Sequence, residues 1–276
     1  MIKDITLGQF FPGNSVLHRI DPRMKLILSV LYIVAVFMAQ SYAAFVLILL
    51  YSFLLVILGR IAVGVVLKGL NPVLFILIFT VLLSVFFTRG AGAEEPIFRF
   101  HAIVIYETGI RRAVFMAVRV VALIIGTSVL LTYTTSPIRL TDGIEALFRP
   151  LAKLHVPVHD FAMMMSIALR FIPTFVEETD KIMNAQKARG TDFSSGGLIR
   201  RAKALLPILI PLIFSAIRRA DDLATAMECR CYRGGEGRTK MRELHYAPRD
   251  LFMFLFVGAF LAAVILVNRF LPMGSL

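Results

Sequence analysis

The sequence predicts an all-α, polytopic membrane protein with about five transmembrane helices and a long helical region outside the hydrocarbon core. Hydrophobic residues make up 58% of the 276 residues, and the mean hydropathy is +0.79. Soluble domains contain roughly 45 to 50% apolar residues. A helix needs about 20 apolar residues to cross the bilayer. Four stretches of about this length or longer contain no Asp, Glu, Lys or Arg: residues 26–59, 69–88, 120–138 and 251–268.

The chain begins with a polar arm, residues 1–25, which contains Asp21-Pro22. The arm lacks the positively charged segment and cleavage site of a secretory signal peptide, so we expect it to be retained. The stretch 26–59 exceeds one ordinary span, and we divide it near Gln40-Ser41-Tyr42 into two short helices. We therefore expect a membrane bundle of about four spans over residues 26–138, and a final transmembrane helix within residues 248–276.

The distribution of Lys and Arg predicts the orientation of these spans. The chain has 30 Lys and Arg against 18 Asp and Glu. Most of the basic residues lie in the arm and in residues 139–249, which fall on one side of the membrane if 26–59 is a hairpin. The positive-inside rule makes that side cytoplasmic, together with the N-terminus. The loop 89–112 would then be outside although it carries four arginines, which argues mildly against this arrangement.

The net charge of +12 is compatible with attraction to anionic lipids of the bilayer or with an acidic protein partner. We do not expect nucleic acid to bind, because no helix-turn-helix, zinc finger or RNA-binding sheet is indicated. The chain has two cysteines, Cys229 and Cys231, and both fall in the cytoplasmic half. They indicate a reducing compartment rather than a disulfide framework.

The region 139–247 is amphipathic and is predicted to be cytoplasmic or interfacial. Its longest uncharged run, residues 204–217, is more typical of a buried or interfacial helix than of a span. Proline within a helix removes a hydrogen bond and bends the helix. We expect three helical segments: 140–154, with Thr141 and Asp142 as candidate caps; 160–189, kinked or restarted at Pro173; and 198–230, bent by Pro207 and Pro211.

The last two segments form a weak repeat with an offset of 41 residues, in which Asp180 corresponds to Asp221 and Arg189 to Arg230. Each arginine ends a helix between small residues, in Ala188-Arg189-Gly190 and Cys229-Arg230-Cys231. Capping of the helix end explains a cation and a following glycine. Small neighbours also allow a partner to approach closely, so that the guanidinium can reach carboxylates. Capping and docking both remain open from these residues alone.

Other candidate chemistry is weaker. His155 and His159 are separated by Pro157, which favours a turn over a pair of metal ligands. Cys229 and Cys231 are a metal-ligand fragment without a second pair of ligands, and small hydrophobic side chains are the more probable role. The acid pairs Glu177-Glu178 and Asp221-Asp222 are followed or preceded at four residues by Lys181 and Arg218, which favours ion pairs on solvated helix faces over catalysis. No Walker loop that would hold ATP phosphates is present.

Taken together, its motifs make the chain resemble the transmembrane T component of energy-coupling factor transporters, the ATP-driven micronutrient importers of prokaryotes. The resemblance covers nearly the whole length, and its stretches are specific in combination. They are the arm His18–Lys25, the turn Thr134–Pro137, Ala168–Thr174, Met183–Gly190 and residues 226–239.

The resemblance implies a non-catalytic scaffold of a prokaryotic cell membrane with long cytoplasmic coupling helices. Each of these helices would dock an Ala-Arg-Gly-like motif on one of two ABC-type ATPase subunits, which use ATP and Mg. A separate substrate-binding membrane subunit, the S component, would rest on the apolar faces of the coupling helices. Ala188, Arg189 and Gly190 match the first motif. The second motif departs from the family, because Cys229 and Cys231 stand where alanine and glycine are usual, and Cys231 lacks the freedom of glycine at positive φ.

In this scaffold, ATP-driven approach of the ATPases would change the angle of the coupling helices at Pro173, Pro207 and Pro211, although fixed bends explain the prolines equally well. The run Met163-Met164-Met165 would usually fill a core, or it could form an adaptable contact with S components. The alternative function is a stand-alone secondary transporter or channel, which would normally place ionisable residues inside the membrane. The predicted spans contain almost none.

Overall fold

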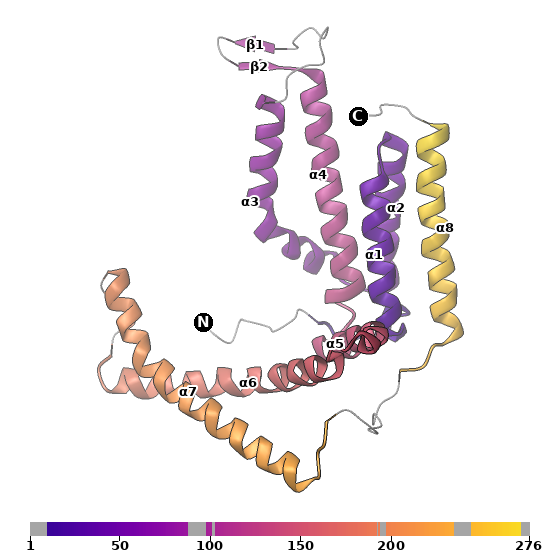
Figure 1. Ribbon diagram of the computed structural model, residues 1–276. Coiled ribbons are helices and arrows are strands. Elements are labelled where there is room, and N and C mark those ends of the chain that lie inside the picture. Colours follow the sequence, from indigo (N-terminus) through magenta and orange to yellow (C-terminus); the bar gives the residue numbers. More distant parts are fainter. Residues whose placement is uncertain are drawn as a thin grey trace. The chain divides into compact units, whose positions relative to one another are not determined.

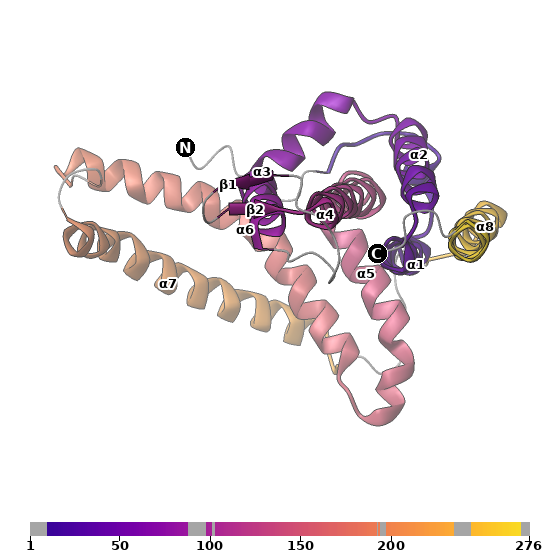
Figure 2. The ribbon, with the colours of Figure 1, turned by 90° about the horizontal axis from the view of Figure 1, so that it is seen from above.

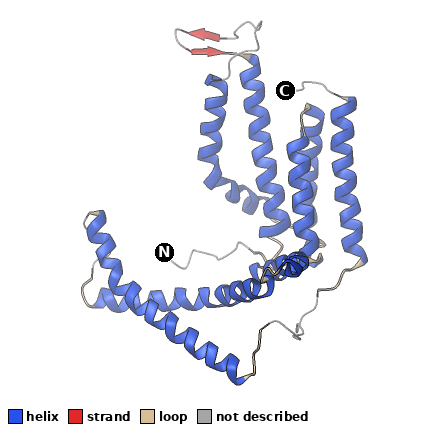
Figure 3. Ribbon diagram, viewed as in Figure 1, coloured by secondary structure: helices blue, strands red, loops and turns tan. Residues whose placement is uncertain are grey.

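The computed structural model describes residues 10–87, 98–100, 103–191, 193, 197–234 and 244–271 (Figure 1). Nearly all of the described chain is helical, as predicted, and Figure 3 shows these helices in blue. One element was not predicted. Strands β1 (Phe98–Phe100) and β2 (Ile103–Ile105) form a short antiparallel hairpin in which Phe98 pairs with Ile105. This hairpin lies in the segment that the sequence analysis interpreted as a loop.

Four helices of the described chain are long and apolar enough to cross a membrane. Helix α1 (Pro22–Met38) corresponds to the first of the five predicted spans. It has 17 residues, one fewer than the shortest of those four helices. Known spans contain roughly 17 to 25 residues, so α1 lies at the lower limit. The four helices that are long and apolar enough to cross a membrane are α2 (Tyr42–Gly59), α3 (Val63–Phe87), α4 with the π-helical turn η3 (Glu107–Thr132), and α8 (Pro248–Phe270).

The division of the first long apolar stretch is confirmed. Helix α1 ends at Met38 and α2 begins at Tyr42. Ser41 caps α2, because its Oγ accepts a hydrogen bond from the Ala44 amide at 3.2 Å. Asn268 of α8 accepts from the Gln40 amide at 3.1 Å and donates to the Met38 carbonyl at 2.6 Å. The turn between the two helices is therefore capped from within and from α8.

The predicted start of the fourth span was wrong, because α4 (Glu107–Thr127) begins well before residue 120. Its first turn accommodates charge through the pair Arg111–Glu107, with 2.9 Å between nitrogen and oxygen. Arg119 lies within α4 and donates to the carbonyl of Ala39 at 2.9 Å. Ala39 is the C-cap of α1, so the guanidinium satisfies an orphan carbonyl. Residues 89–97, 101 and 102 of the predicted loop lie outside the described residues.

The chain divides into two compact units. The bundle unit contains Gly8–Gly143 and Leu244–Leu276, and the α6–α7 unit contains Ile144–Glu243. Aromatic side chains form much of the bundle core, where the rings of Tyr51 and Phe260 stack with centroids 3.9 Å apart. The buried Tyr32 hydroxyl donates to the Ala122 carbonyl at 2.8 Å and lies 2.8 Å from Ser52 Oγ. Its polar end is thus satisfied inside an apolar core.

Two of the stretches that carry the family resemblance meet inside the bundle unit. The arm contains a 3₁₀ turn, η2 (Leu17–Arg19), and leads into α1. Lys25 is 2% exposed, and its Nζ donates to the Thr134 carbonyl at 2.9 Å and to Thr135 Oγ1 at 2.9 Å. The Asp21 amide donates to Asp250 Oδ1 of α8 at 3.0 Å. Buried polar groups therefore join the arm to the end of η3 and to the start of α8.

The predicted second and third segments of the amphipathic region are confirmed to within two residues, as α6 (Val158–Ala188) and α7 (Leu198–Cys229). Both helices are continuous through their prolines, so a restart at Pro173 is excluded. The first segment begins earlier than expected, as α5 (Pro137–Phe148), and continues as the 3₁₀ turn η4 (Arg149–Leu154). Thr141 is therefore inside α5 and donates to the Pro137 carbonyl at 3.0 Å instead of capping the helix.

Helices α6 and α7 pack against each other; Figure 1 shows α7 crossing α6, and Figure 2 shows the two side by side and running in opposite directions. Arg219 Nη2 of α7 lies 3.1 Å from Glu178 Oε2 of α6. Beyond the end of α7, the Tyr232 hydroxyl donates to Met163 Sδ at 3.2 Å. The end of α7 therefore lies against the first turns of α6.

Candidate docking site at the ends of α6 and α7

The two arginine motifs end their helices with the same backbone conformation. Arg189 has φ −84° and ψ 6°, and Arg230 has φ −92° and ψ 13°. The residue after each arginine is left-handed, with φ 84° at Gly190 and 55° at Cys231. Both helices therefore terminate at the residue that the sequence analysis singled out.

The hydrogen bonds at the two ends also match. At the end of α6, Gly190 N donates to Lys187 O at 2.9 Å and Thr191 N to Gln186 O at 3.0 Å. These two bonds define a Schellman motif, which satisfies carbonyls of the last helical turn. At the end of α7 the same two bonds run from Cys231 N to Glu228 O at 2.8 Å and from Tyr232 N to Met227 O at 3.0 Å. The 41-residue repeat is thus also a repeat of backbone structure.

The departure of the second motif from glycine does not change this conformation. Cys231 adopts the left-handed region although it has a Cβ, which costs roughly 1–2 kcal/mol relative to a right-handed conformation. Both cysteines are free and exposed. The side chains of Ala188, Arg189 and Arg230 are exposed as well. All six predicted docking residues are therefore accessible on the α6–α7 unit.

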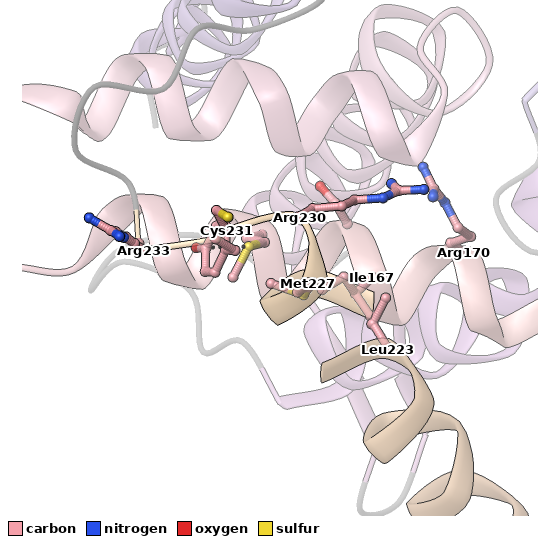
Figure 4. A pocket seen from close by; sticks show the side chains of 11 residues that line it. Ile167, Arg170, Leu223, Met227, Arg230, Cys231 and Arg233 are labelled. Carbon is pink, nitrogen blue, oxygen red and sulfur yellow. Dashed lines mark hydrogen bonds between the residues drawn. The ribbon is translucent and has the colours of Figure 1, made fainter. Parts of the chain in front are cut away.

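The surroundings of the two ends differ. A Cβ placed on Gly190 would meet no atom within 4 Å. Arg230 and Cys231, in contrast, line a cavity of about 640 Å³ between the end of α7 and the start of α6 (Figure 4). Arg170 of α6 and Arg233 line the same cavity. The sequence analysis did not identify these two arginines as site residues.

The three predicted methionine contacts do not share one environment. Met163 lines the cavity and accepts the hydrogen bond from Tyr232. Met164 and Met165 are 53% and 54% exposed. Successive residues of a helix point in different directions because a turn contains 3.6 residues. Met164 and Met165 are therefore available for an external contact, whereas Met163 takes part in α6–α7 packing.

The histidines and acids that the sequence analysis considered for chemistry have different surroundings. His155 is a left-handed cap with φ 61°, whereas His159 lies in the first turn of α6, 3.1 Å from Glu145 Oε1. The predicted turn at His155 is thus confirmed. Within the described residues, neither Glu177–Lys181 nor Arg218–Asp222 forms an ion pair, and the pair found in their place is Glu178–Arg219 between the helices.

The neighbours of Glu178 where α6 and α7 meet lower the pKa of its carboxyl. A hydrogen bond from Ser215 is the largest cause, and the hydrogen bond and positive charge of Arg219 act in the same direction. Together they hold the pKa of the Glu178 carboxyl below its ordinary value, against a smaller effect of burial. The carboxylate therefore stays ionised where α6 and α7 meet.

Comparison with known proteins identifies the family. Residues 13–241 match the family model CbiQ, described as cobalt transport protein. The chain is 52% identical over 250 residues to the energy-coupling factor transporter transmembrane protein EcfT of Clostridium kluyveri, which covers 91% of this chain and 92% of that protein. The chain belongs to the EcfT family. It is also 49% identical over 268 residues to EcfT of Ruminiclostridium cellulolyticum, with 97% and 98% of the two chains covered, and 47% identical over 251 residues to EcfT of Bacillus subtilis, with 91% and 93% covered.

Membership of the EcfT family confirms the resemblance drawn from the sequence. The protein is a transmembrane component of an energy-coupling factor transporter, and hence one subunit of a larger complex. Its four long apolar helices agree with a place in the membrane. The relatives are named as transporter transmembrane components rather than as enzymes.

Proposed function

We propose that this EcfT protein is the scaffold through which two ABC-type ATPase subunits drive a separate substrate-binding membrane subunit, the S component, during import of vitamins or other micronutrients. The observation that carries the proposal is the presentation of two exposed arginines by identical Schellman motifs at the ends of two long helices. ATP and Mg are used by the ATPase subunits, because this chain has no Walker loop.

The geometry of the helix ends favours docking over simple capping. In each motif two carbonyls of the last turn accept hydrogen bonds from backbone amides, so the arginine side chain is not required at those two carbonyls. Its planar fork of donors is then available for a carboxylate of a partner. Two equivalent ends are what a pair of related ATPase subunits would need.

Transmission requires that α6 and α7 move as long levers. The Glu178–Arg219 pair and the Tyr232–Met163 hydrogen bond join the two helices. We propose that ATPase approach changes the helix angles at Pro173, Pro207 and Pro211, where backbone hydrogen bonds are missing. Spin labels on both sides of Pro173 should change their separation when nucleotide binds to the complex, and constant separations would show that the bends are fixed.

We assign the exposed Met164 and Met165, with Met163 beside them, to contact with S components, since flexible thioethers adapt to different surfaces. Replacing all three by isoleucine should weaken some S-component pairings more than others. A Met163→Ile variant alone separates the effect on α6–α7 packing from that on the exposed pair. Uniform tolerance of all S components would remove this assignment.

In this proposal the protein lies in the cell membrane of a prokaryote with its N-terminus and the α6–α7 unit in the cytoplasm, where the ATPases are. In a variant that also carries Cys229→Ser and Cys231→Ser, because both native cysteines are free and exposed, a cysteine introduced at residue 5 should then react with a membrane-impermeant thiol reagent only after the cells are opened. Labelling in intact cells would place the arm outside.

The test of the proposed function is to purify the tagged chain from its native membrane and to identify accompanying proteins by mass spectrometry. ABC-type ATPases should accompany the wild type and be lost from the double variant Arg189→Ala/Arg230→Ala. The matched control is Arg218→Ala, which removes an exposed arginine of α7 away from both motifs. The alternative, a stand-alone secondary transporter or channel, requires that the chain alone transports in liposomes. Arg119, an ionisable residue within α4, is already bonded to Ala39, which does not favour a coupling role for it.

A further inference from the structure

The cavity at the end of α7 is formed by two facing helical stripes. On α6 the stripe consists of residues at i, i+3, i+4 and i+7, and on α7 of residues at i, i+4 and i+7; this spacing places each set on one helix face. The C-terminal member of each stripe is an arginine, Arg170 on α6 and Arg230 on α7, and because the helices are antiparallel (Figure 2) these two positions lie at opposite ends of the cavity. The members are Met163, Ser166, Ile167 and Arg170 on α6, and Leu223, Met227 and Arg230 on α7.

The side chains of the two arginines lean toward each other across the cavity. In Figure 4 the side chains of Arg170 and Arg230 extend toward one another, whereas Arg233 points away from them. Among the described residues, no carboxylate lines the cavity and neither guanidinium forms an ion pair. Two neighbouring positive charges repel each other unless an anion lies between them.

The rest of the lining fits an acidic side chain of a protein. Met163 and Ile167 of α6 and Leu223 and Met227 of α7 give both sides of the cavity an apolar surface, which suits the methylene stem of an acid and an apolar neighbour. Two guanidinium forks can each donate two parallel hydrogen bonds to carboxylate oxygens. The cavity thus offers apolar surface on both sides and two guanidinium groups that lean toward each other (Figure 4).

We infer that Arg170 and Arg230 together bind one carboxylate of an ABC-type ATPase subunit. Arg170 is then a contact residue that lies 60 positions from the motif in sequence, and the docking element of α7 is completed by α6. This inference rests on the proposed function, because it specifies how one of the two ATPase contacts is made.

The experiment uses the whole complex purified through a tag on this chain. The amount of each ATPase retained per chain is measured by quantitative mass spectrometry over a series of NaCl concentrations, which gives an apparent affinity. Arg170→Ala should weaken retention of one ATPase about tenfold or more, because it leaves a desolvated carboxylate with half of its donors. Retention by Arg170→Lys should lie between that of the wild type and that of Arg170→Ala, because lysine keeps the positive charge and lacks the paired donors of the guanidinium. Arg218→Ala is the matched control and should behave as wild type.

A double-mutant cycle separates a shared anion from two independent contacts. If one carboxylate is shared, the two arginines are coupled, and the loss in Arg170→Ala/Arg230→Ala differs from the product of the two single losses. Independent, multiplying losses would overturn the inference, as would full retention in Arg170→Ala when Arg230→Ala is impaired. If Arg170→Ala changes only the anionic phospholipid that copurifies, the site binds a headgroup and the inference is wrong. Absence of any ATPase from the wild type would instead overturn the proposed function.

Discussion

The ends of α6 and α7 have the same backbone and different surroundings. Arg189 precedes a glycine whose missing side chain would meet no atom within 4 Å. Arg230 precedes Cys231, and both residues line the cavity shared with Arg170. At the α7 end, the Tyr232 hydroxyl bonds to Met163. The equivalent of Tyr232 at the α6 end is Thr191, for which only the backbone bond of the motif is recorded in the described structure.

This difference shows that a repeated motif fixes the conformation of a helix end without fixing the shape of the surface around it. At the end of α6, Arg189 is exposed. At the end of α7, Arg230 lines a cavity together with residues of α6. We expect a partner groove at α6 to enclose a single guanidinium, and a partner at α7 to insert a side chain into the cavity. Two different grooves, on two different ATPases, would suit such unlike ends.

The largest expected effect belongs to Arg189→Ala. Because the α6 end offers a single guanidinium, its removal should cost about 2–4 kcal/mol of ATPase binding, as for a typical interface hot spot. Arg230→Ala should cost less, since Arg170 remains beside it. Retention of each ATPase on the tagged chain in a salt series measures both losses. Equal losses of one and the same ATPase in the two variants would remove the distinction between the ends.

The next effect concerns the left-handed residues, for which the two ends should respond in opposite directions. Gly190→Ala introduces a Cβ at φ 84° and should destabilise the end of α6 by about 1–2 kcal/mol. Cys231→Gly removes one at φ 55° and should stabilise the end of α7 by about 1 kcal/mol. Hydrogen exchange of the Thr191 and Tyr232 amides, which close the two motifs, reports each change. Exchange that slows in both variants, or in neither, contradicts the assignment.

Sequence patterns were sufficient for the parts of this molecule that depend on local chemistry. Long charge-free runs located the membrane helices, and Gly190 located the end of α6. They failed at α4, whose first turn contains charged residues, Glu107 and Arg111, that pair with each other. Thr141 is a similar case, because its hydroxyl bonds the Pro137 carbonyl inside a helix.

Arg170 was missed for a related reason. Its spacing of seven residues from Met163 is visible in the sequence, as is that of Arg230 from Leu223. Such spacing is typical of any helix face. Its meaning depends on the antiparallel packing that brings the two stripes together, and the sequence of one helix carries no record of its partner.

A smaller effect is expected from Tyr232→Phe, which removes the hydrogen bond to Met163 Sδ and retains the ring. A single hydrogen bond contributes about 0.5–1.5 kcal/mol, and sulfur is a weak acceptor, so the loss should be near the lower value. Amides at the end of α7 should exchange faster while those at the end of α6 are unchanged. Thr191→Val, at the equivalent position of the repeat, is the control. Faster exchange at both ends would mean that the two helix ends are not separate structures.

The smallest effect tests whether α6 and α7 stay together independently of their ends. The folded pKa of Glu178 is held below its unfolded value by Ser215 and Arg219. The contact therefore contributes stability above the unfolded pKa, and this contribution is lost as pH falls through the folded pKa. The side chains of Arg219 and Glu178 are 38% and 24% exposed, so solvent screening keeps the effect of their ion pair on stability small.

Spin labels near residues 178 and 219 should report a broader distance distribution as pH falls from about 5 to about 3. The distribution in Glu178→Gln should not change with pH. A wild-type distribution that is equally independent of pH would show that apolar packing alone holds α6 against α7. The positions of Arg189 and Arg230 would then not depend on the charge of Glu178.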